Sequence, residues 1–187
     1  MRAAVLHEYG ATPRVGDFAE PEGDLVVDVL AAGLNPIDLR IASGTLPARR
    51  PDLPSVVGSE GIGRTADGRR VYFSGAAVAE RAAASEPLEV PDGVDDAEAL
   101  AYGVAGLAAW LALDKARLQE GETVLVLGAS GPVGAIALQL ARLRGAGRVV
   151  AAARREVGGA DAFVQLTDDP SFDEQFDVVI DPLWGKP

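Results

Sequence analysis

The most constraining part of this chain is residues 123–155, where a strand, a glycine-rich turn, a helix and a second strand follow one another. The β-prone run Thr123–Leu127 leads into the turn 128–134, which holds three glycines at intervals of three residues. Apolar residues then recur at helical spacing as far as Arg144, and Arg148–Ala153 predicts the next strand. A βαβ unit with such a turn is typical of folds that bind the pyrophosphate of a dinucleotide.

Glycine is needed at each of the three positions of the turn for a separate physical reason. Gly128 permits the tight reversal, Gly131 lets the backbone approach a pyrophosphate, and Gly134 lets the helix pack closely on the strand. The spacing Gly-x-x-Gly-x-x-Gly differs from the plain Gly-x-Gly-x-x-Gly, and a strand–helix junction without a ligand is the alternative. We expect phosphates to be bound by the whole turn, namely Gly128, Ala129, Ser130, Gly131, Pro132, Val133 and Gly134.

The residues about twenty positions beyond the turn indicate which dinucleotide would bind. An acidic residue there holds the ribose 2′-hydroxyl of NAD, whereas arginine accommodates the 2′-phosphate of NADP. Here the second strand ends in Arg154 and Arg155, and Glu156 comes only after both. The sequence therefore predicts NADPH as the cofactor, with solvated strand-end charges as the alternative interpretation of the two arginines.

The composition excludes several other classes of function. The chain has 187 residues, a formal net charge of −11, no cysteine and a single histidine, His7. Such a charge argues against nucleic acid and anionic membranes as partners, because both require local positive potential. Without cysteine or a second histidine, we expect no disulfide and no metal site. No window approaches the roughly 18 consecutive apolar residues of a membrane span, and no signal-peptide core is visible, so a cytoplasmic location is predicted.

The predicted secondary structure changes from mainly strands to helices near residues 95–105. Before this point short β signals are separated by prolines, and after it helical runs lead into the βαβ unit, so the fold class predicted is α/β with domains 1–100 and 101–187. The predicted strands of the first part are residues 2–6, 25–30, 61–65, 70–73 and 76–84. The later predictions are helices over 95–102 and 106–118, and strands over 161–166 and 177–180.

Four blocks in a fixed order carry a resemblance to a known family. They are residues 29–38, which end in Asn-Pro-Ile-Asp, residues 57–63 with Gly-Ser-Glu-Gly-Ile-Gly, the helical run 106–113, and residues 120–134 with the glycine turn. Together they are similar to the medium-chain dehydrogenase/reductase superfamily, most closely its zinc-independent quinone oxidoreductase branch, to which zeta-crystallin belongs. The resemblance covers nearly the whole chain.

This resemblance implies both a fold and a chemistry. It implies an N-terminal GroES-like β-barrel domain followed by a Rossmann domain, with the active site between them. Asn35 and Ser59 stand where zinc-dependent relatives carry metal-binding cysteine and histidine. It further implies that hydride passes from NADPH to a small-molecule quinone or α,β-unsaturated carbonyl. Asn35 is the catalytic candidate, or else only a turn residue before proline. Asp38 is expected to cap the following helix, and Glu60 to support the fold.

Several departures from the family pattern are also visible. Relatives continue beyond the last predicted strand, so the chain resembles a C-terminally truncated member with a partial Rossmann domain. The helix expected after Arg155 is reduced to residues 156–159, which predicts exposed apolar strand and an edge that could pair in a homo-oligomer. Relatives often have threonine at the position of Ala108 and tyrosine at that of Leu166.

These departures keep a second class of function open. A non-catalytic nucleotide-binding or structural relative would show the same glycine turn without turnover. A short-chain dehydrogenase is excluded, because none of the tyrosines is followed four positions later by the lysine that its Tyr-x-x-x-Lys pair requires.

Overall fold

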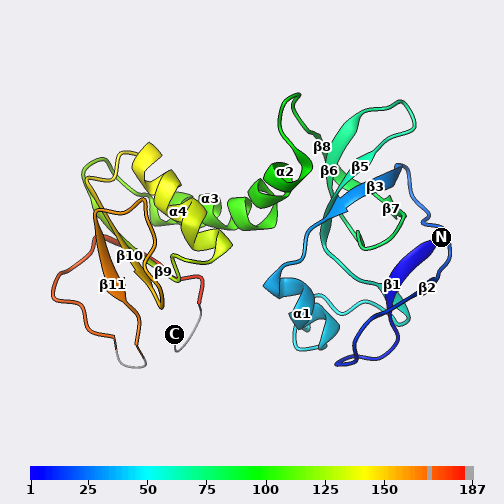
Figure 1. The fold of residues 1–187 in the computed structure, drawn as a ribbon, viewed down its shortest axis with the longest axis horizontal. Coiled ribbons are helices and arrows are strands. Elements are labelled where there is room, and N and C mark those ends of the chain that lie inside the picture. Colours follow the sequence, from blue (N-terminus) through cyan, green and yellow to red (C-terminus); the bar gives the residue numbers. More distant parts are fainter. Residues whose placement is uncertain (168–169, 184–187) are drawn as a thin grey trace. The chain divides into compact units, whose positions relative to one another are not determined.

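The computed structural model describes residues 1–167 and 170–183 and divides into two compact units, Met1–Val104 and Ala105–Pro187 (Figure 1). The first unit contains two antiparallel sheets with strand orders β2-β1-β4 and β7-β3-β5-β6-β8. Their strands are β1 (Arg2–Leu6), β2 (Arg14–Asp17), β3 (Val26–Ala32), β4 (Ser55–Val56), β5 (Glu60–Arg64), β6 (Arg70–Ser74), β7 (Arg81–Ala83) and β8 (Ser85–Glu89). Two helices, α1 (Pro36–Ala42) and α2 (Asp96–Tyr102), complete the unit.

The two sheets of the first unit meet through the segment before β7. A single bridge joins Ala3 to Ala79, and the backbone N–H of Ala4 donates to the carbonyl oxygen of Val78 over 2.9 Å. The prediction of one strand over residues 76–84 is therefore wrong for its first half, which crosses beside β1 with isolated bonds in place of a ladder. Only Arg81–Ala83 forms a strand. With its two sheets joined in this way, the unit has the GroES-like fold that the resemblance implied.

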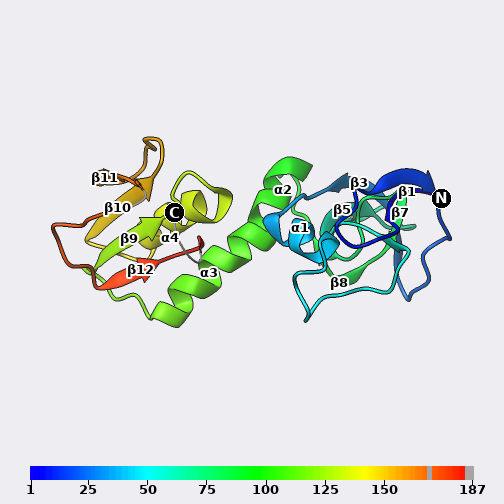
Figure 2. The ribbon, with the colours of Figure 1, turned by 90° about the horizontal axis from the view of Figure 1, so that it is seen from below.

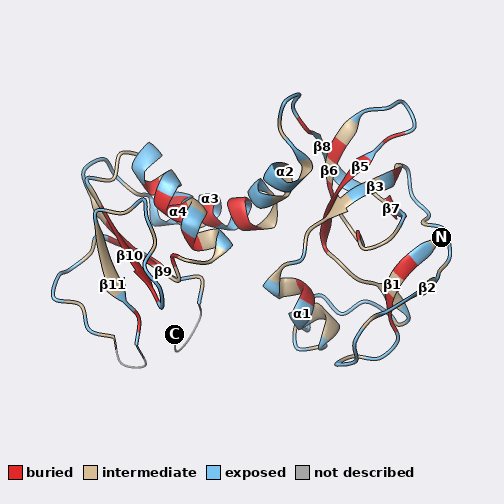
Figure 3. Cartoon of the chain, viewed as in Figure 1, coloured by how far each residue is buried: buried red, intermediate tan, exposed pale blue. Residues whose placement is uncertain are grey.

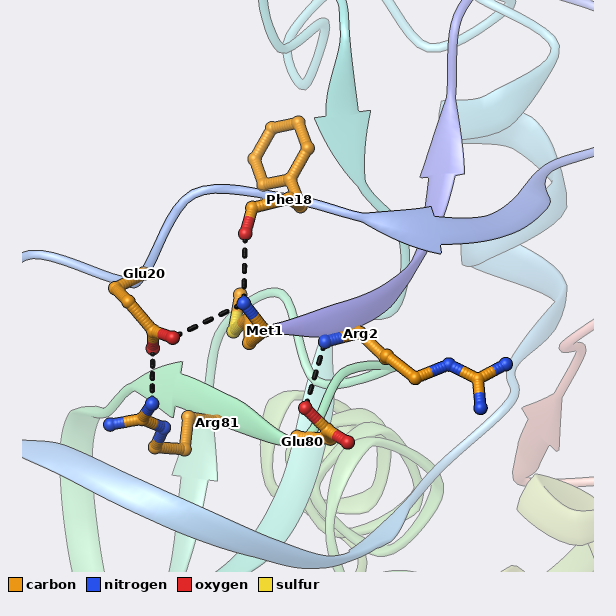
Figure 4. A network of polar contacts seen from close by, with 6 residues as sticks. All are labelled: Met1, Arg2, Phe18, Glu20, Glu80 and Arg81. Carbon is orange, nitrogen blue, oxygen red and sulfur yellow. Dashed lines mark hydrogen bonds and ion pairs between the residues drawn. The ribbon is translucent and has the colours of Figure 1, made fainter.

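Polar contacts around the first residues connect β1 with β7 (Figure 4). The amino group of Met1 pairs with Glu20 at 3.1 Å, and Glu20 also pairs with Arg81 at 2.8 Å. The backbone N–H of Arg2 donates to the carboxylate of Glu80 over 2.8 Å. Because exposed ion pairs contribute at most about 1 kcal/mol each, the position of β1 depends mainly on its backbone ladder with β2 and β4.

The second unit is built on one parallel sheet with strand order β11-β10-β9-β12. Numbered along the unit, this is the order 3-2-1-4, which is that of the first four strands of a doubly wound nucleotide-binding sheet. The α/β class with a GroES-like unit and a partial Rossmann sheet is thus confirmed. The elements are α3 (Val104–Ala116), β9 (Thr123–Leu127), α4 (Pro132–Leu143), β10 (Arg148–Ala153), β11 (Ala162–Gln165) and β12 (Val178–Ile180) (Figure 2).

The two faces of this sheet are covered in different ways. On one face α3 and α4 pack on β9, β10 and β12, where the strands are buried (Figure 3). On the other face no helix lies among the described residues 154–167 and 170–177. There Val150 and Ala152 are nevertheless fully buried, in a cluster completed by Leu166, Phe172 and Phe176. The prediction of exposed apolar strand is therefore wrong for β10, where a loop with two aromatic rings covers what a crossover helix normally covers. It holds at Val179 of β12, which pairs with Leu125 and is 51% exposed.

One helical stretch of the described chain, Asp96–Ala116, is long and apolar enough by length and composition to cross a membrane. It consists of α2 and α3, which are separated at Gly103. Core helices of soluble proteins meet the same criterion. Here 33% of the apolar window is buried, including Ala109 and Leu113 of α3, which pack against the parallel sheet.

Candidate functional site

The glycine turn forms the junction between β9 and α4. Gly128 has a positive φ of 61°, which favours glycine, and its carbonyl oxygen accepts the N–H of Gly131 over 2.9 Å. Gly131 is the N-cap of α4, and Pro132 occupies the first helical turn. Because the first N–H groups of an α-helix have no intrahelical acceptor, those of Val133 and Gly134 are available to an anion.

The close approach of helix and turn depends on Gly134. A Cβ atom at this position would lie 2.4 Å from the carbonyl oxygen of Gly128, whereas one at Gly131 would lie 3.4 Å from the same atom. Ala129 has another task, since it is 1% exposed and its N–H donates to the carbonyl oxygen of Ala152 over 3.1 Å. Its amide therefore bonds to β10 and is not free for a phosphate, unlike the amides of Val133 and Gly134.

The predicted arginines lie at the same edge of the sheet as the turn. Parallel pairing sets Ala152 opposite Leu127, so Arg154 leaves β10 beside the point at which Gly128 leaves β9. Arg154 and Arg155 are both exposed. The fold thus brings the cationic pair and the glycine turn to one carboxyl edge, which is where sheets of this type bind nucleotides.

In the first unit, Asn35 lies at the start of α1 and is anchored by two carboxylates. Its backbone N–H donates to Oδ2 of Asp38 over 2.7 Å, as in a capping box, and its side-chain Nδ2 donates to Oε1 of Glu60 over 2.5 Å. Oε2 of Glu60 accepts from the hydroxyl of Tyr72 over 3.0 Å and from the N–H of Val104 over 2.8 Å. Asp38 therefore has the capping role predicted for it.

The pKa of Tyr72 depends on this environment. Burial raises its pKa to about 12 from about 10, and the Glu60 charge and hydrogen bond add to the shift. A raised pKa means that Tyr72 stabilises the folded state fully below about pH 10, and this stabilisation is lost as the pH rises through about 12. We expect the difference in tyrosinate absorbance between the wild type and Tyr72→Phe to have its midpoint near pH 12. A midpoint near pH 10 would contradict the buried Tyr72–Glu60 contact.

A cavity of about 390 Å³ lies within the first unit, between α1, β4 and the loop that contains Arg49 and Arg50. Its lining includes Asp38 and Ser59, which are 8% and 9% exposed. Oδ1 of Asp38 and Oγ of Ser59 are buried and have no hydrogen-bond partner among the described residues. Two buried polar atoms of cavity-lining residues therefore have hydrogen-bonding capacity that the described residues leave unused.

The sequence named Glu60 as a support for the fold but could not reveal its partners. Glu60, Tyr72 and Val104 meet only through the fold, and no local pattern links them. Leu166, which stands where relatives often carry tyrosine, is 7% exposed and packs in the sheet core beside Val150. Among residues 1–167 and 170–183, no group of three or more histidine, cysteine or acidic side chains could hold a metal ion.

A GroES-like unit and a parallel nucleotide-binding sheet in one chain are the two parts of a medium-chain dehydrogenase/reductase. The family model described as the alcohol dehydrogenase GroES-like domain matches residues 21–120. The chain therefore belongs to this family, as a quinone oxidoreductase-like member of the medium-chain dehydrogenase/reductase superfamily.

The relatives include free-standing enzymes and parts of larger ones. Human quinone oxidoreductase is 36% identical over an alignment of 168 residues, which covers 78% of this chain and 50% of that protein. A phenolphthiocerol/phthiocerol polyketide synthase protein of Mycobacterium tuberculosis is 35% identical over 201 residues, covering 89% of this chain and 9% of that protein. The chain thus spans half the length of the human protein and a small part of the synthase protein.

A solved structure agrees with these relatives. The quinone oxidoreductase of Thermus thermophilus, which was also crystallised with NADPH, matches with a TM-score of 0.77 and 35% identity. The match covers 88% of this chain and 60% of that one.

Proposed function

We propose that this chain is an NADPH-dependent, zinc-free oxidoreductase that transfers hydride to a quinone or an α,β-unsaturated carbonyl compound. In this proposal residues 1–100 receive the acceptor, and residues 101–187 bind the cofactor. The observation that carries it is the glycine turn with Arg154 beside it at one carboxyl edge of the parallel sheet. The proposed partner is the small-molecule quinone or α,β-unsaturated carbonyl compound. A cytoplasmic location and assembly of this chain into a homo-oligomer stay predictions.

The turn fits a dinucleotide on physical grounds. Gly134 has no room for a Cβ, and the N-cap Gly131 has no side chain to occupy the first-turn amides of α4. The amides of Val133 and Gly134 would bind the pyrophosphate, helped by the positive end of the helix dipole. Arg154 and Arg155 would bind the 2′-phosphate, a contact that NADH lacks.

The chemistry divides between the cofactor and this chain's own side chains. NADPH supplies the hydride when bound. The oxygen that becomes negative on the acceptor must be met by hydrogen-bond donors, since the chain has no cysteine and one histidine with which to hold zinc. We assign this task to the side-chain amide of Asn35 and to the hydroxyl of Ser59. Ser59 is a cavity-lining residue, and its buried Oγ has no hydrogen-bond partner among the described residues.

Cofactor choice tests the arginine assignment. We expect NADPH to bind more tightly than NADH, and Arg154→Ala to weaken NADPH binding by roughly 10- to 100-fold, the value of one or two hydrogen bonds to a charged group. NADH binding should change little, because it has no 2′-phosphate. Titration followed by nicotinamide fluorescence gives both dissociation constants.

Lys115→Ala is the matched control for this titration. It removes one positive charge from an exposed position at the end of α3, so it separates a specific contact from the general loss of charge. Equal affinities for NADPH and NADH, or equal losses in the Arg154 and Lys115 variants, would refute the NADP assignment. Tight NADPH binding without reduction of any quinone or enone would instead support the non-catalytic relative.

A further inference from the structure

Glu60 is the most deeply buried polar side chain among the described residues, with 2% of its surface exposed. Removing a carboxylate from water is costly unless hydrogen bonds replace the lost solvation. Hydride transfer as proposed above does not involve this group. Its burial in the first unit, beside the candidate Asn35, therefore requires its own explanation.

Three donors surround the Glu60 carboxylate. Oε1 accepts from Nδ2 of Asn35 over 2.5 Å, and Oε2 accepts from the hydroxyl of Tyr72 and the backbone N–H of Val104. Carboxylate oxygens that accept from donors of this kind replace the hydration that burial removes. Oε1 of Glu60 therefore presents a hydrogen-bond acceptor to the side chain of Asn35.

The backbone around Glu60 is shaped to keep the carboxylate in this position. A Cβ atom at Gly33 would lie 2.5 Å from Oε1, and one at Gly103 would lie 2.1 Å from Oε2. The N–H of Gly33 also donates to the backbone carbonyl oxygen of Glu60 over 3.1 Å. Two glycines from separate segments thus leave the space that the carboxylate fills.

We propose that Glu60 is a positioning residue that fixes the orientation of the Asn35 side-chain amide. An asparagine amide can rotate by a half turn, which exchanges its NH₂ donor for its oxygen acceptor. An acceptor at Oε1 selects the orientation with Nδ2 toward Glu60. Oδ1 and the second N–H of Asn35 then stay free of Glu60, and Asp38 fixes the backbone of the same residue. The catalytic consequence rests on the proposed function, whereas the orientation does not.

The orientation is tested first by NMR on the ¹⁵N-labelled full chain, with Asn35→Ala used to assign the side-chain signals. In the wild type we expect one of the two Asn35 Nδ2 protons to exchange with water at least about tenfold more slowly than the other, because one is bonded to Glu60. Glu60→Gln offers one acceptor oxygen to three donors, so this difference should disappear. Glu89→Gln, an exposed charge loss on β8, should leave it intact.

Equal exchange of the two protons in the wild type would overturn the proposal, even if Glu60→Gln does not fold. An unchanged difference in a folded Glu60→Gln variant would overturn it as well. Both outcomes are independent of enzymatic turnover.

Kinetics test the catalytic consequence. Glu60→Gln should lower kcat for a quinone by up to roughly 100-fold, the cost of a misplaced catalytic group, while the Kd for NADPH stays within about twofold. In an Asn35→Ala background the same change should add no further loss of kcat, because Glu60 acts through Asn35. Additive losses would refute that route. Absence of turnover in the wild type would refute the proposed function alone and leave the exchange experiment decisive for Glu60.

Discussion

Replacing Gly134 with alanine should abolish measurable NADPH binding and destabilise the second unit by about 1–3 kcal/mol. The added Cβ would lie 2.4 Å from the carbonyl oxygen of Gly128 and 2.7 Å from Cα of Ala129, and neither backbone atom can move aside without distorting the turn. The helix would be pushed away from the strand end, and the first-turn amides would move with it. Thermal unfolding followed by circular dichroism and NADPH fluorescence titration measure the two effects.

Gly131→Ala is the control for this variant. Its Cβ would lie 3.4 Å from the same Gly128 oxygen, and the φ of Gly131 is −87°, which alanine adopts without strain. We expect its stability to stay within about 0.5 kcal/mol of the wild type, with NADPH binding weakened because the methyl group obstructs the pyrophosphate. If both variants bind NADPH like the wild type, the turn is a strand–helix junction without a ligand.

Replacing Gly103 with alanine should destabilise the first unit by about 3 kcal/mol. Its Cβ would lie 2.1 Å from Oε2 of Glu60 and 2.6 Å from Cε2 of Tyr72. Glu60 cannot withdraw without losing its donors, so the clash would break bonds to a buried carboxylate. Denaturant unfolding of the full chain, followed by tyrosine fluorescence, measures the loss.

Gly16→Ala on β2 serves as its control, because a Cβ there has nothing within 4 Å and the glycine does not have a positive φ. This variant should stay within about 0.5 kcal/mol of the wild type. Equal stability of the Gly103 and Gly16 variants would mean that there is room for a methyl group beside the Glu60 carboxylate. That result would contradict the tight enclosure on which the positioning role of Glu60 depends.

The sequence predicted best those elements whose signal is local. The βαβ unit was found because apolar periodicity and glycine spacing act within about thirty residues. The edge strand β8 was missed, since Ser85–Glu89 contains a proline and two glutamates and all five residues are exposed. Pairing with β6 makes it a strand, and such pairing is decided by tertiary contacts that no local propensity contains.

The candidate site divides in the same way. The glycine turn and Arg154 could be predicted, because parallel strands bring consecutive strand ends to one edge. The enclosure of Glu60 could not, since Gly33 and Gly103 are distant from it in sequence and are recognised only once the fold sets them around its carboxylate. The only available signal of this enclosure was the presence of glycines shortly before helices α1 and α3. Glycine occurs near helix starts for many reasons, so that signal does not point to Glu60.

The loop that carries Phe172 and Phe176 covers one face of the parallel sheet and separates two tasks that a crossover helix usually performs together. A helix both returns the chain to the starting edge of the sheet and shields the strands from water. In this chain residues 154–161 connect β10 to β11 without a helix. Phe172 and Phe176, packed edge to face with ring centroids 6.0 Å apart, provide part of the shielding. An edge of the kind proposed here to bind phosphate can therefore stand on a sheet whose described residues form no helix on one side, provided that a few large side chains cover most of that face.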